Sequence, residues 1–217
     1  AASAAEAGDS AADAEVYSTP TAELALQLFA RYLFIDMIRD VIDFCGINYY
    51  GFEYLVGASA EMETSKFEYS GSGRAISATG FVNVLAQFHS RYKSDPDARF
   101  VGANGLGYFI TENGVADATD VLRPAYITEH LSALAYARDV LEIPIRGYIH
   151  WTITDNWEWA DGYCPKFGLV AVNRASVDLR RVPRDSYYLY RQIVTSRRVT
   201  AEQSIAAWEA VVAASTS

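Results

Sequence analysis

The stretch GYFITENG, residues 107–114, joins a short apolar run to a carboxylate and a turn, and the interpretation of the fold starts from it. The apolar run predicts a buried strand, and the Asn-Gly pair predicts that this strand ends in a turn. Two other stretches have the same character, VIDFCGINYYG at 41–51 and IRGYIHWTI at 145–153. Helical patterns separate these three stretches, and such alternation predicts a parallel sheet with helical crossovers.

Apolar residues at helical spacing predict three helices that precede or connect these strands. The first starts at Pro20, the second follows Gly80, and the third runs from Pro124 to Leu141. Residues 57–78 are polar and rich in Gly and Ser, which predicts a long loop over one end of the fold.

The C-terminal part is predicted to hold an extra strand or hairpin at FGLVAV (167–172) and two helices. One helix covers DSYYLYRQIV (185–194), and the last starts at Thr200, which forms a capping-box pattern with Gln203. An apolar stripe on the last helix is predicted to pack on the core or to dock onto another surface. The residues of this stripe are Ile205, Trp208 and Val212.

Composition excludes several classes of protein. With 217 residues, 51% of them hydrophobic, the chain can bury a sizeable core. A net charge of −9 leaves no basic surface for nucleic acid, so we expect no nucleic-acid partner. Cys45 and Cys164 are too few for a disulfide framework and lack the paired spacing of metal ligands. No apolar run approaches the roughly 18 residues that a membrane-spanning helix needs.

Polar side chains gather where the three predicted strands end. Asn48 and Tyr50 close the first strand, Glu112 closes the second, and segment 155–159 follows the third. The carboxyl ends of parallel strands carry the active site in a (β/α)₈ barrel and the ligand site in a doubly wound sheet, so this pattern fits both folds. The chain has no GxGxxG or GxxxxGK[ST] motif, which disfavours nucleotide-binding versions.

Three long motifs resemble the last three strand ends of glycoside hydrolase family 1, the retaining β-glycosidases. They are DFCGINYYG (43–51), YFITENG (108–114) and IHWTITDNWEWADGYCPKFGLVAV (149–172). SGRAISATGFVNVLAQFHSRY (72–92) and TAEQSIAAW (200–208) are further similar to the plant galactolipid:galactolipid galactosyltransferase branch. The resemblance implies α/β architecture, with strands 6 to 8 of a TIM barrel and their helices in this chain.

The domain organisation follows from the resemblance. We expect a flexible leader rich in Ala, Ser and acidic residues over 1–19, the C-terminal half of a TIM-barrel glycosidase domain over 20–198, and a C-terminal helix over 199–217.

The resemblance also implies a nucleophile and its partners. Retaining glycosidases use two carboxyl groups about 5–5.5 Å apart, one as nucleophile and one as acid/base. By resemblance Glu112 is the nucleophile, the Tyr50 hydroxyl orients it, and Asn48 lines the same pocket.

A sugar-binding loop follows the third strand. By resemblance Trp151 is the platform under the glycone, Glu158 grips its distal hydroxyls, and Trp159 adds a further contact. Asp155 and three tryptophans cluster in this loop, which favours a site over ordinary core packing. Because Glu158 would repel a phosphate, we expect an unphosphorylated sugar. No residue pattern predicts a metal ion or another cofactor.

About half of the implied enzyme is missing from these residues. The family takes its acid/base glutamate from an Asn-Glu-Pro motif on the fourth strand, and no such motif occurs here. Three barrel strands are predicted where eight are required, and an open edge is costly. We therefore expect an N-terminal barrel half as partner, either from the same gene product or as a separate chain, or a place in a larger assembly.

Three functions from different classes remain open at this point. The completed barrel could hydrolyse β-glycosides or transfer galactose between galactolipids, and the residues do not decide between these reactions. The half-barrel could instead be a noncatalytic structural or interaction subunit of a larger complex, or a module that binds carbohydrate or glycolipid headgroups. The sequence alone leaves localisation unknown; the galactosyltransferase branch would place the protein at the chloroplast envelope, and otherwise we expect a cytoplasmic protein.

Overall fold

The computed structural model describes residues 32–52, 54–56, 59–61 and 70–216. The chain divides into two units, residues 1–38 and residues 39–217. Of the first unit, the described part includes one helix, α2 (Leu33–Ile38). The predicted leader and most of the helix predicted from Pro20 lie outside the described residues. The predicted domain boundaries stay predictions.

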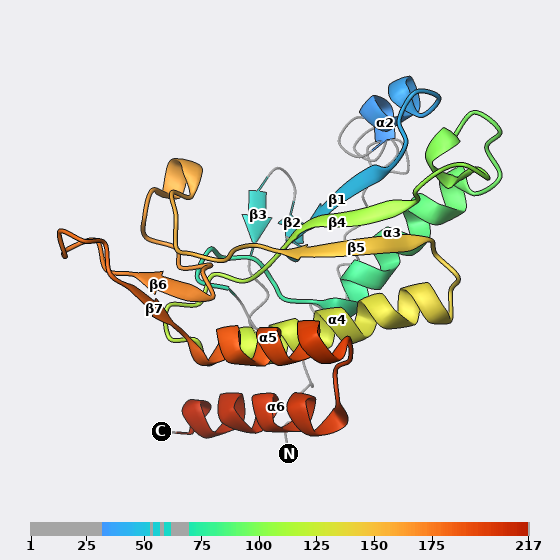
Figure 1. The fold of residues 1–217 in the computed structure, drawn as a ribbon. Coiled ribbons are helices and arrows are strands. Elements are labelled where there is room, and N and C mark those ends of the chain that lie inside the picture. The colour runs from blue at the N-terminus through green and yellow to red at the C-terminus, as the bar shows by residue number, and fades with distance from the viewer. Residues whose placement is uncertain (1–31, 53, 57–58, 62–69, 217) are drawn as a thin grey trace, which may run out of the picture. The chain divides into compact units, whose positions relative to one another are not determined.

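The second unit is built on a parallel sheet of three strands. These are β1 (Cys45–Tyr49), β4 (Tyr108–Asn113) and β5 (Ile145–His150), and they lie in the order β1-β4-β5 (Figure 1). Both strand pairs are parallel, as the alternation of strands and helices in the sequence predicts. Because the strands are parallel and adjacent, their carboxyl ends meet at one edge of the sheet.

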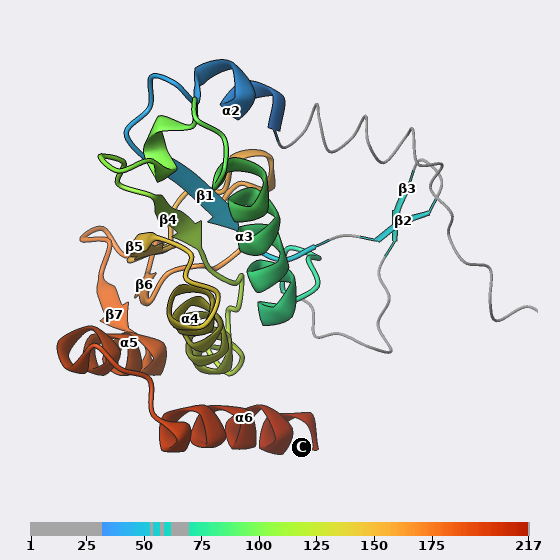
Figure 2. The same cartoon turned by 90° about the vertical axis from the view of Figure 1, so that its right-hand side faces the viewer.

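Two helices form the crossovers and cover one face of this sheet (Figure 2). Helix α3 (Ala78–Tyr92) begins at Ser77, whose Oγ accepts a hydrogen bond of 2.9 Å from the Gly80 amide. Helix α4 (Arg123–Asp139) has proline in its first turn. The buried Tyr49 ring of β1 stacks on Phe81 of α3 at a centroid distance of 4.9 Å, so burial of aromatic rings holds the helix against the sheet.

Helix α5 (Asp185–Ser196) lies beside α4, and helix α6 (Ala201–Ser215) packs on α4 from the side away from the sheet (Figures 1 and 2). The predicted capping box of α6 is present, with Thr200 and Gln203 bonded in both directions. The predicted apolar stripe is partly wrong as a core contact, because Ile205 and Val212 are 58% and 61% exposed. Ala207 and Val211 are buried instead, and they pack against Ala125 of α4.

Shorter elements lie outside the main sheet. A hairpin of β6 (Val170–Val172) and β7 (Arg181–Pro183) confirms the extra hairpin predicted at FGLVAV. Within the described ranges, single turns of 3₁₀ helix occur at Arg99–Val101 and Trp159–Asp161. Of the predicted loop 57–78, residues 59–61 and 70–78 are described; strand β3 (Ser59–Glu61) falls within it and pairs with β2 (Tyr54–Val56).

The second face of the sheet carries exposed apolar side chains. Phe44 before β1 is 47% exposed, Ile149 of β5 is 58% exposed, and Ile153 beyond β5 is 55% exposed. In the described part of the chain, the outer edges of β1 and β5 pair with no further strand of this sheet. Exposed apolar surface and unpaired strand edges are costly in water, and both are expected where a barrel is cut open.

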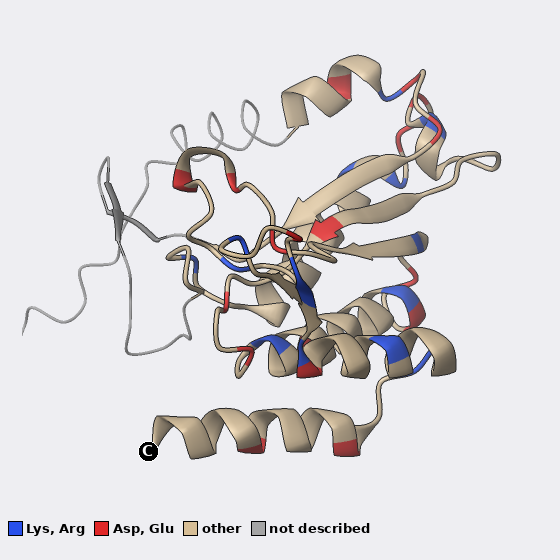
Figure 3. Ribbon diagram, turned by 60° about the vertical axis from the view of Figure 1, so that its left-hand side comes forward, with Lys and Arg blue, Asp and Glu red and all other residues tan. Residues whose placement is uncertain are grey.

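Charged residues do not form a continuous basic surface in the described part. Lys and Arg lie among Asp and Glu on α4, α5 and the connecting segments, whereas α6 carries acidic residues alone (Figure 3). None of the helices described is both long enough and apolar enough to cross a lipid bilayer.

Candidate active site

An irregularity in β4 turns Glu112 toward the open face of the sheet. Ile47 of β1 lies opposite Ile110, but Asn48 lies opposite Glu112, so β4 has one extra residue at this point. The pairing with β5 shifts between Ile110 and Asn113 as well. An extra residue of this kind re-aims the side chains that follow it. Ile110 and Asn113 are consequently both buried toward the helices, and Glu112 between them is only partly buried.

The side chain of Glu112 is held by Tyr50. The Tyr50 hydroxyl donates a hydrogen bond of 2.6 Å to Glu112 Oε2. Burial, together with this hydrogen bond, raises the pKa of Tyr50 far above its ordinary value, so the phenol keeps its proton and acts as a donor. The Tyr50 ring meets Phe167 edge-on, with centroids 5.7 Å apart. Tyr50 therefore fixes one oxygen of the carboxylate and leaves the other available.

Asn48 lies at the end of β1 and bonds to β4. Its Oδ1 accepts a hydrogen bond of 2.6 Å from Thr111 Oγ1, and the side chain is exposed on the open face of the sheet. Asn48 is absent from the wall of the cavity that Glu112 lines. In this structure it bridges β1 to β4 beside the site; its assignment as a pocket residue stays a prediction.

The residues that the resemblance assigns to sugar binding come from the segment after β5. Trp151 Nε1 donates a hydrogen bond of 3.2 Å to Glu158 Oε1, which orients the indole and the carboxylate together. Burial raises the pKa of Glu158, and the Trp151 hydrogen bond opposes this shift; the charge of Glu112 adds to the increase. Trp159 is 77% exposed, so its ring has a face free for a ligand.

A cavity of about 240 Å³ brings five of the six predicted site residues together. Its volume is below the roughly 300–1,000 Å³ of common ligand sites, in keeping with a wall that other barrel strands would supply. Five lining residues were not assigned to the cavity from the sequence: Ser72, Arg74, Ala160, Asp161 and Phe167. The complete lining is Tyr50, Ser72, Arg74, Glu112, Trp151, Glu158, Trp159, Ala160, Asp161 and Phe167.

The first carboxylate of the loop, Asp155, has a structural role. Its Oδ2 lies 2.9 Å from Arg184 Nη2, and both side chains are buried. Asp155 Oδ1 also accepts a hydrogen bond of 2.9 Å from the Gly168 amide. The sequence suggested that Asp155 belongs to the sugar-binding cluster, and this is wrong, because the carboxylate is engaged by these two donors. Trp157 lies outside the cavity as well and packs edge-on against Tyr163.

A close backbone contact joins the ends of β4 and β5. The Trp151 amide donates a hydrogen bond of 2.9 Å to the Asn113 carbonyl. A Cβ atom on Gly114 would lie 1.8 Å from the Trp151 carbonyl oxygen, so only glycine permits this approach. The glycine of the Asn-Gly pair thereby permits the close approach of the end of β4 to Trp151.

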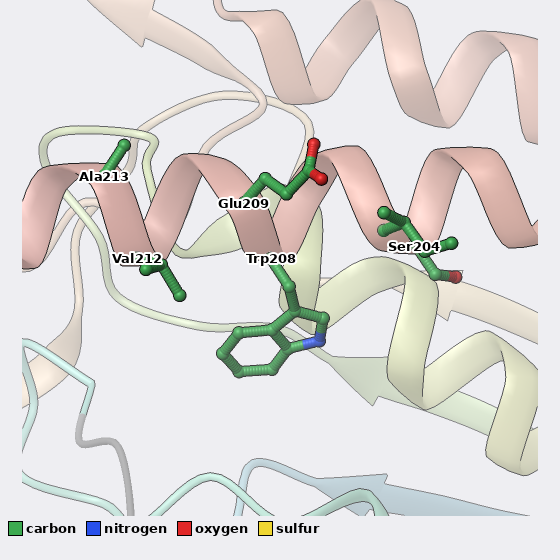
Figure 4. A pocket seen from close by; sticks show the side chains of 6 residues that line it. Ser204, Trp208, Glu209, Val212 and Ala213 are labelled. Carbon is green, nitrogen blue, oxygen red and sulfur yellow. The ribbon is translucent and has the colours of Figure 1, made fainter.

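A second hollow lies on helix α6, and it has a different chemistry (Figure 4). Its lining is mostly apolar, and its single ionisable residue is Glu209. It has no converging polar groups of the kind that catalysis requires, so we do not assign the active site to it. The lining residues are Ser204, Ile205, Trp208, Glu209, Val212 and Ala213.

The chain is similar to glycosyl hydrolases in sequence. The profile of glycosyl hydrolase family 1 matches residues 33–199. Galactolipid galactosyltransferase SFR2, chloroplastic, of Arabidopsis thaliana is 49% identical over 81% of this chain and 26% of that protein. Beta-glucosidase-like SFR2, chloroplastic, of Oryza sativa subsp. japonica is 45% identical over 81% of this chain and 25% of that protein. The chain therefore spans about a quarter of the length of these relatives.

Solved structures give the same fold. A hyperthermophilic β-glucosidase from Pyrococcus furiosus superposes with a TM-score of 0.71 at 28% sequence identity. The match covers 87% of this chain and 40% of the β-glucosidase. Such structural relatives are TIM barrels, which confirms the prediction that this chain is the C-terminal part of a (β/α)₈ barrel.

Proposed function

Because the chain belongs to glycosyl hydrolase family 1, we propose that it supplies the nucleophile and the sugar-binding loop of a retaining β-glycosidase-like site. The observation that carries this proposal is the 2.6 Å hydrogen bond from Tyr50 to Glu112, in a cavity that Trp151 and Glu158 also line. A donor on one carboxylate oxygen directs the other oxygen toward the space where a sugar would lie.

The reaction would proceed in two balanced steps. In the first, a Glu112 oxygen bonds to the anomeric carbon, and the bond from that carbon to the leaving oxygen breaks as this oxygen takes a proton. In the second, an acceptor hydroxyl loses a proton and attacks the same carbon, which releases Glu112. The proton donor and acceptor in both steps is a glutamate of the barrel half that this chain lacks, either in the same polypeptide or in a partner chain.

The residues after β5 would hold the sugar. The indole face of Trp151 would stack on the apolar side of the ring, and the Glu158 carboxylate would accept hydrogen bonds from two neighbouring hydroxyls. The Trp151–Glu158 hydrogen bond keeps these two groups at a fixed spacing. The glycone then lies between this loop and Glu112.

We propose galactolipid as the substrate and galactosyl transfer as the reaction. The similarity to galactolipid galactosyltransferase SFR2 of Arabidopsis thaliana supports this choice, and the names of both SFR2 relatives support a chloroplast location. Transfer and hydrolysis share the glycosyl-enzyme and differ in whether water is kept from the acceptor position. Of the acceptor-side segment that we propose, 57–78, residues 59–61 and 70–78 are described, and its Ser72 and Arg74 line the cavity beside Glu112.

The test uses the complete-barrel protein, meaning this chain together with the barrel half that it lacks. Incubation with a galactolipid radiolabelled in galactose should give labelled oligogalactolipids, with little free galactose. Glu112→Gln, which keeps the size of the side chain but removes its nucleophilic charge, should abolish both products. Free galactose as the main product would limit the function to hydrolysis, and equal turnover by Glu112→Gln would refute the proposal.

A noncatalytic subunit remains the second candidate, because the chain contains no Asn-Glu-Pro motif. Isolation of the chain in stoichiometric amount from a complex whose other subunits also lack this motif would favour that candidate. Recovery of the motif on the same polypeptide or on a copurifying partner would favour the enzyme.

A further inference from the structure

Asn113 lies directly after Glu112 and is the centre of a buried hydrogen-bond cluster. Its side chain is 0% exposed. Asn113 Nδ2 donates to the Tyr49 carbonyl at 2.7 Å and to the Tyr126 hydroxyl at 2.8 Å. Asn113 Oδ1 accepts from the Tyr148 hydroxyl at 2.9 Å. One side chain thus ties together β1, β5 and α4 at the end of β4.

The direction of these hydrogen bonds follows from the chemistry of the groups. A carbonyl oxygen can only accept, so the Asn113 amide nitrogen must face Tyr49, and its oxygen must face Tyr148. Tyr148 uses its only proton for Asn113, so its contact of 3.3 Å with His150 Nδ1 requires the proton to be on that nitrogen. Burial lowers the pKa of His150 to about 3, in agreement with a neutral ring.

The second ring nitrogen of His150 supports the same tautomer. Among the described residues, Nε2 of His150 is buried without a hydrogen-bond partner. A buried N–H without an acceptor is rarer and more costly than an acceptor without a donor, so the proton belongs on Nδ1. The hydrogen bonds therefore all point in one direction, from His150 through Tyr148 and Asn113 to the Tyr49 carbonyl.

The Asn113–Tyr49 hydrogen bond and the Tyr50–Glu112 hydrogen bond join β4 to β1 at consecutive residues. Asn113 and Glu112 are neighbours on β4, and Tyr49 and Tyr50 are neighbours at the end of β1. One bond lies on the helix side of the sheet, and the other lies in the cavity. Since β4 has an extra residue at this point, ordinary strand pairing does not fix the direction of the Glu112 side chain.

We propose that His150, Tyr148 and Asn113 are positioning residues that hold Glu112 at its distance from Tyr50. This inference rests on the proposed function, because it concerns the reactivity of Glu112 as a nucleophile. The three residues touch no substrate. They act by fixing the end of β4 against β1, and an error of about 1 Å in the placement of a reacting group can cost roughly a hundredfold in rate.

The test measures how fast an activated 2-deoxy-2-fluoro galactoside labels Glu112 in the complete-barrel protein. Tyr148→Phe removes the hydroxyl together with its hydrogen bonds to Asn113 and His150, and should slow labelling about tenfold, with the affinity for a reversible sugar inhibitor unchanged. Tyr108→Phe is the matched control, because the Tyr108 hydroxyl on β4 is buried without a hydrogen-bond partner among the described residues. It should label at the wild-type rate.

A double-mutant cycle separates positioning from a general loss of stability. In the Tyr50→Phe background, Tyr148→Phe should slow labelling by less than about twofold, because the contact that it protects is already gone. His150→Asn retains an N–H donor near the place of Nδ1 and should label faster than His150→Leu.

Three outcomes would overturn the inference while the wild type still labels. They are a wild-type rate for Tyr148→Phe, the same tenfold loss in both backgrounds, or equal rates for the two His150 variants. A wild-type protein that never labels would instead refute the proposed function.

Discussion

Replacement of Tyr50 by phenylalanine isolates the contact on which the site depends. The variant removes the hydroxyl that lies 2.6 Å from Glu112 Oε2 and retains the ring that packs edge-on against Phe167. A hydrogen bond to a charged acceptor contributes about 1.5–3 kcal/mol. If the transition state needs the whole of this contribution to orient Glu112, Tyr50→Phe slows formation of the glycosyl-enzyme by about 10- to 150-fold.

The assay is the rate at which an activated fluorosugar labels the complete-barrel protein, followed by the increase in intact mass. Tyr50 orients the nucleophile, whereas Trp151 and Glu158 bind the sugar. The loss should therefore fall on the rate at saturating reagent, and the half-saturating concentration should change little. Tyr50→Phe that labels at the wild-type rate would refute the role given to this hydrogen bond, and a large rise in the half-saturating concentration alone would assign Tyr50 to binding.

Three further predictions concern binding and stability. Glu158→Gln should weaken the binding of a reversible galactose-like inhibitor about tenfold, as measured by calorimetry. Burial raises the pKa of Glu158 above the ordinary 4.5. The wild-type affinity should therefore be full above the raised pKa and should fall as the pH drops through it. Asp155→Asn leaves the buried Arg184 without its counter-charge and should lower the free energy of unfolding by about 3–5 kcal/mol in urea titrations. Burial lowers the pKa of His130 from 6.5 to about 4 and the pKa of His150 from 6.5 to about 3. The unfolded chain therefore binds more protons than the folded chain below pH 6.5. As the pH falls below 6.5, the free energy of unfolding should decrease by up to about 1.4 kcal/mol per pH unit for each histidine.

Each of these predictions has a control and a contradicting result. If the inhibitor affinity has the same pH dependence in Glu158→Gln and in wild type, Glu158 does not take part in sugar recognition. The exposed Asp178→Asn should stay within about 0.5 kcal/mol of wild type, and an equally small effect of Asp155→Asn would mean that the Arg184 ion pair contributes little. A stability that is flat below pH 6.5 would contradict neutral, buried histidines.

The sequence predicts the fold well because the long apolar strands and the helix caps are local features. The periodicity and the Thr200 capping box mark the helices, and the three strands follow from short, mainly apolar stretches. The direction of Glu112 is not local. Strict alternation along β4 would place Glu112 on the same face as the buried Ile110, and the extra residue that reverses this is visible only in the pairing with both neighbouring strands.

The other site and core residues that the sequence did not predict correctly are also determined by tertiary contacts. Asp155 has the composition of a site residue, but Arg184, 29 positions later, engages it in the core. Ser72 and Arg74 come from a segment without a strong local pattern, and the fold brings them to the wall of the cavity. Helix α6 buries Ala207 and Val211 because α4 meets it on that face, and the larger side chains of Ile205 and Val212 are left outside.

The central claim is that the carboxylate of Glu112 bonds covalently to a sugar when the barrel is complete. The most direct measurement is mass spectrometry of the complete-barrel protein after reaction with an activated 2-deoxy-2-fluoro galactoside. The account predicts one sugar adduct per chain, on the peptide that contains Glu112, and no adduct in Glu112→Gln. A complete barrel that stays unlabelled, or an adduct on any other residue, would contradict it.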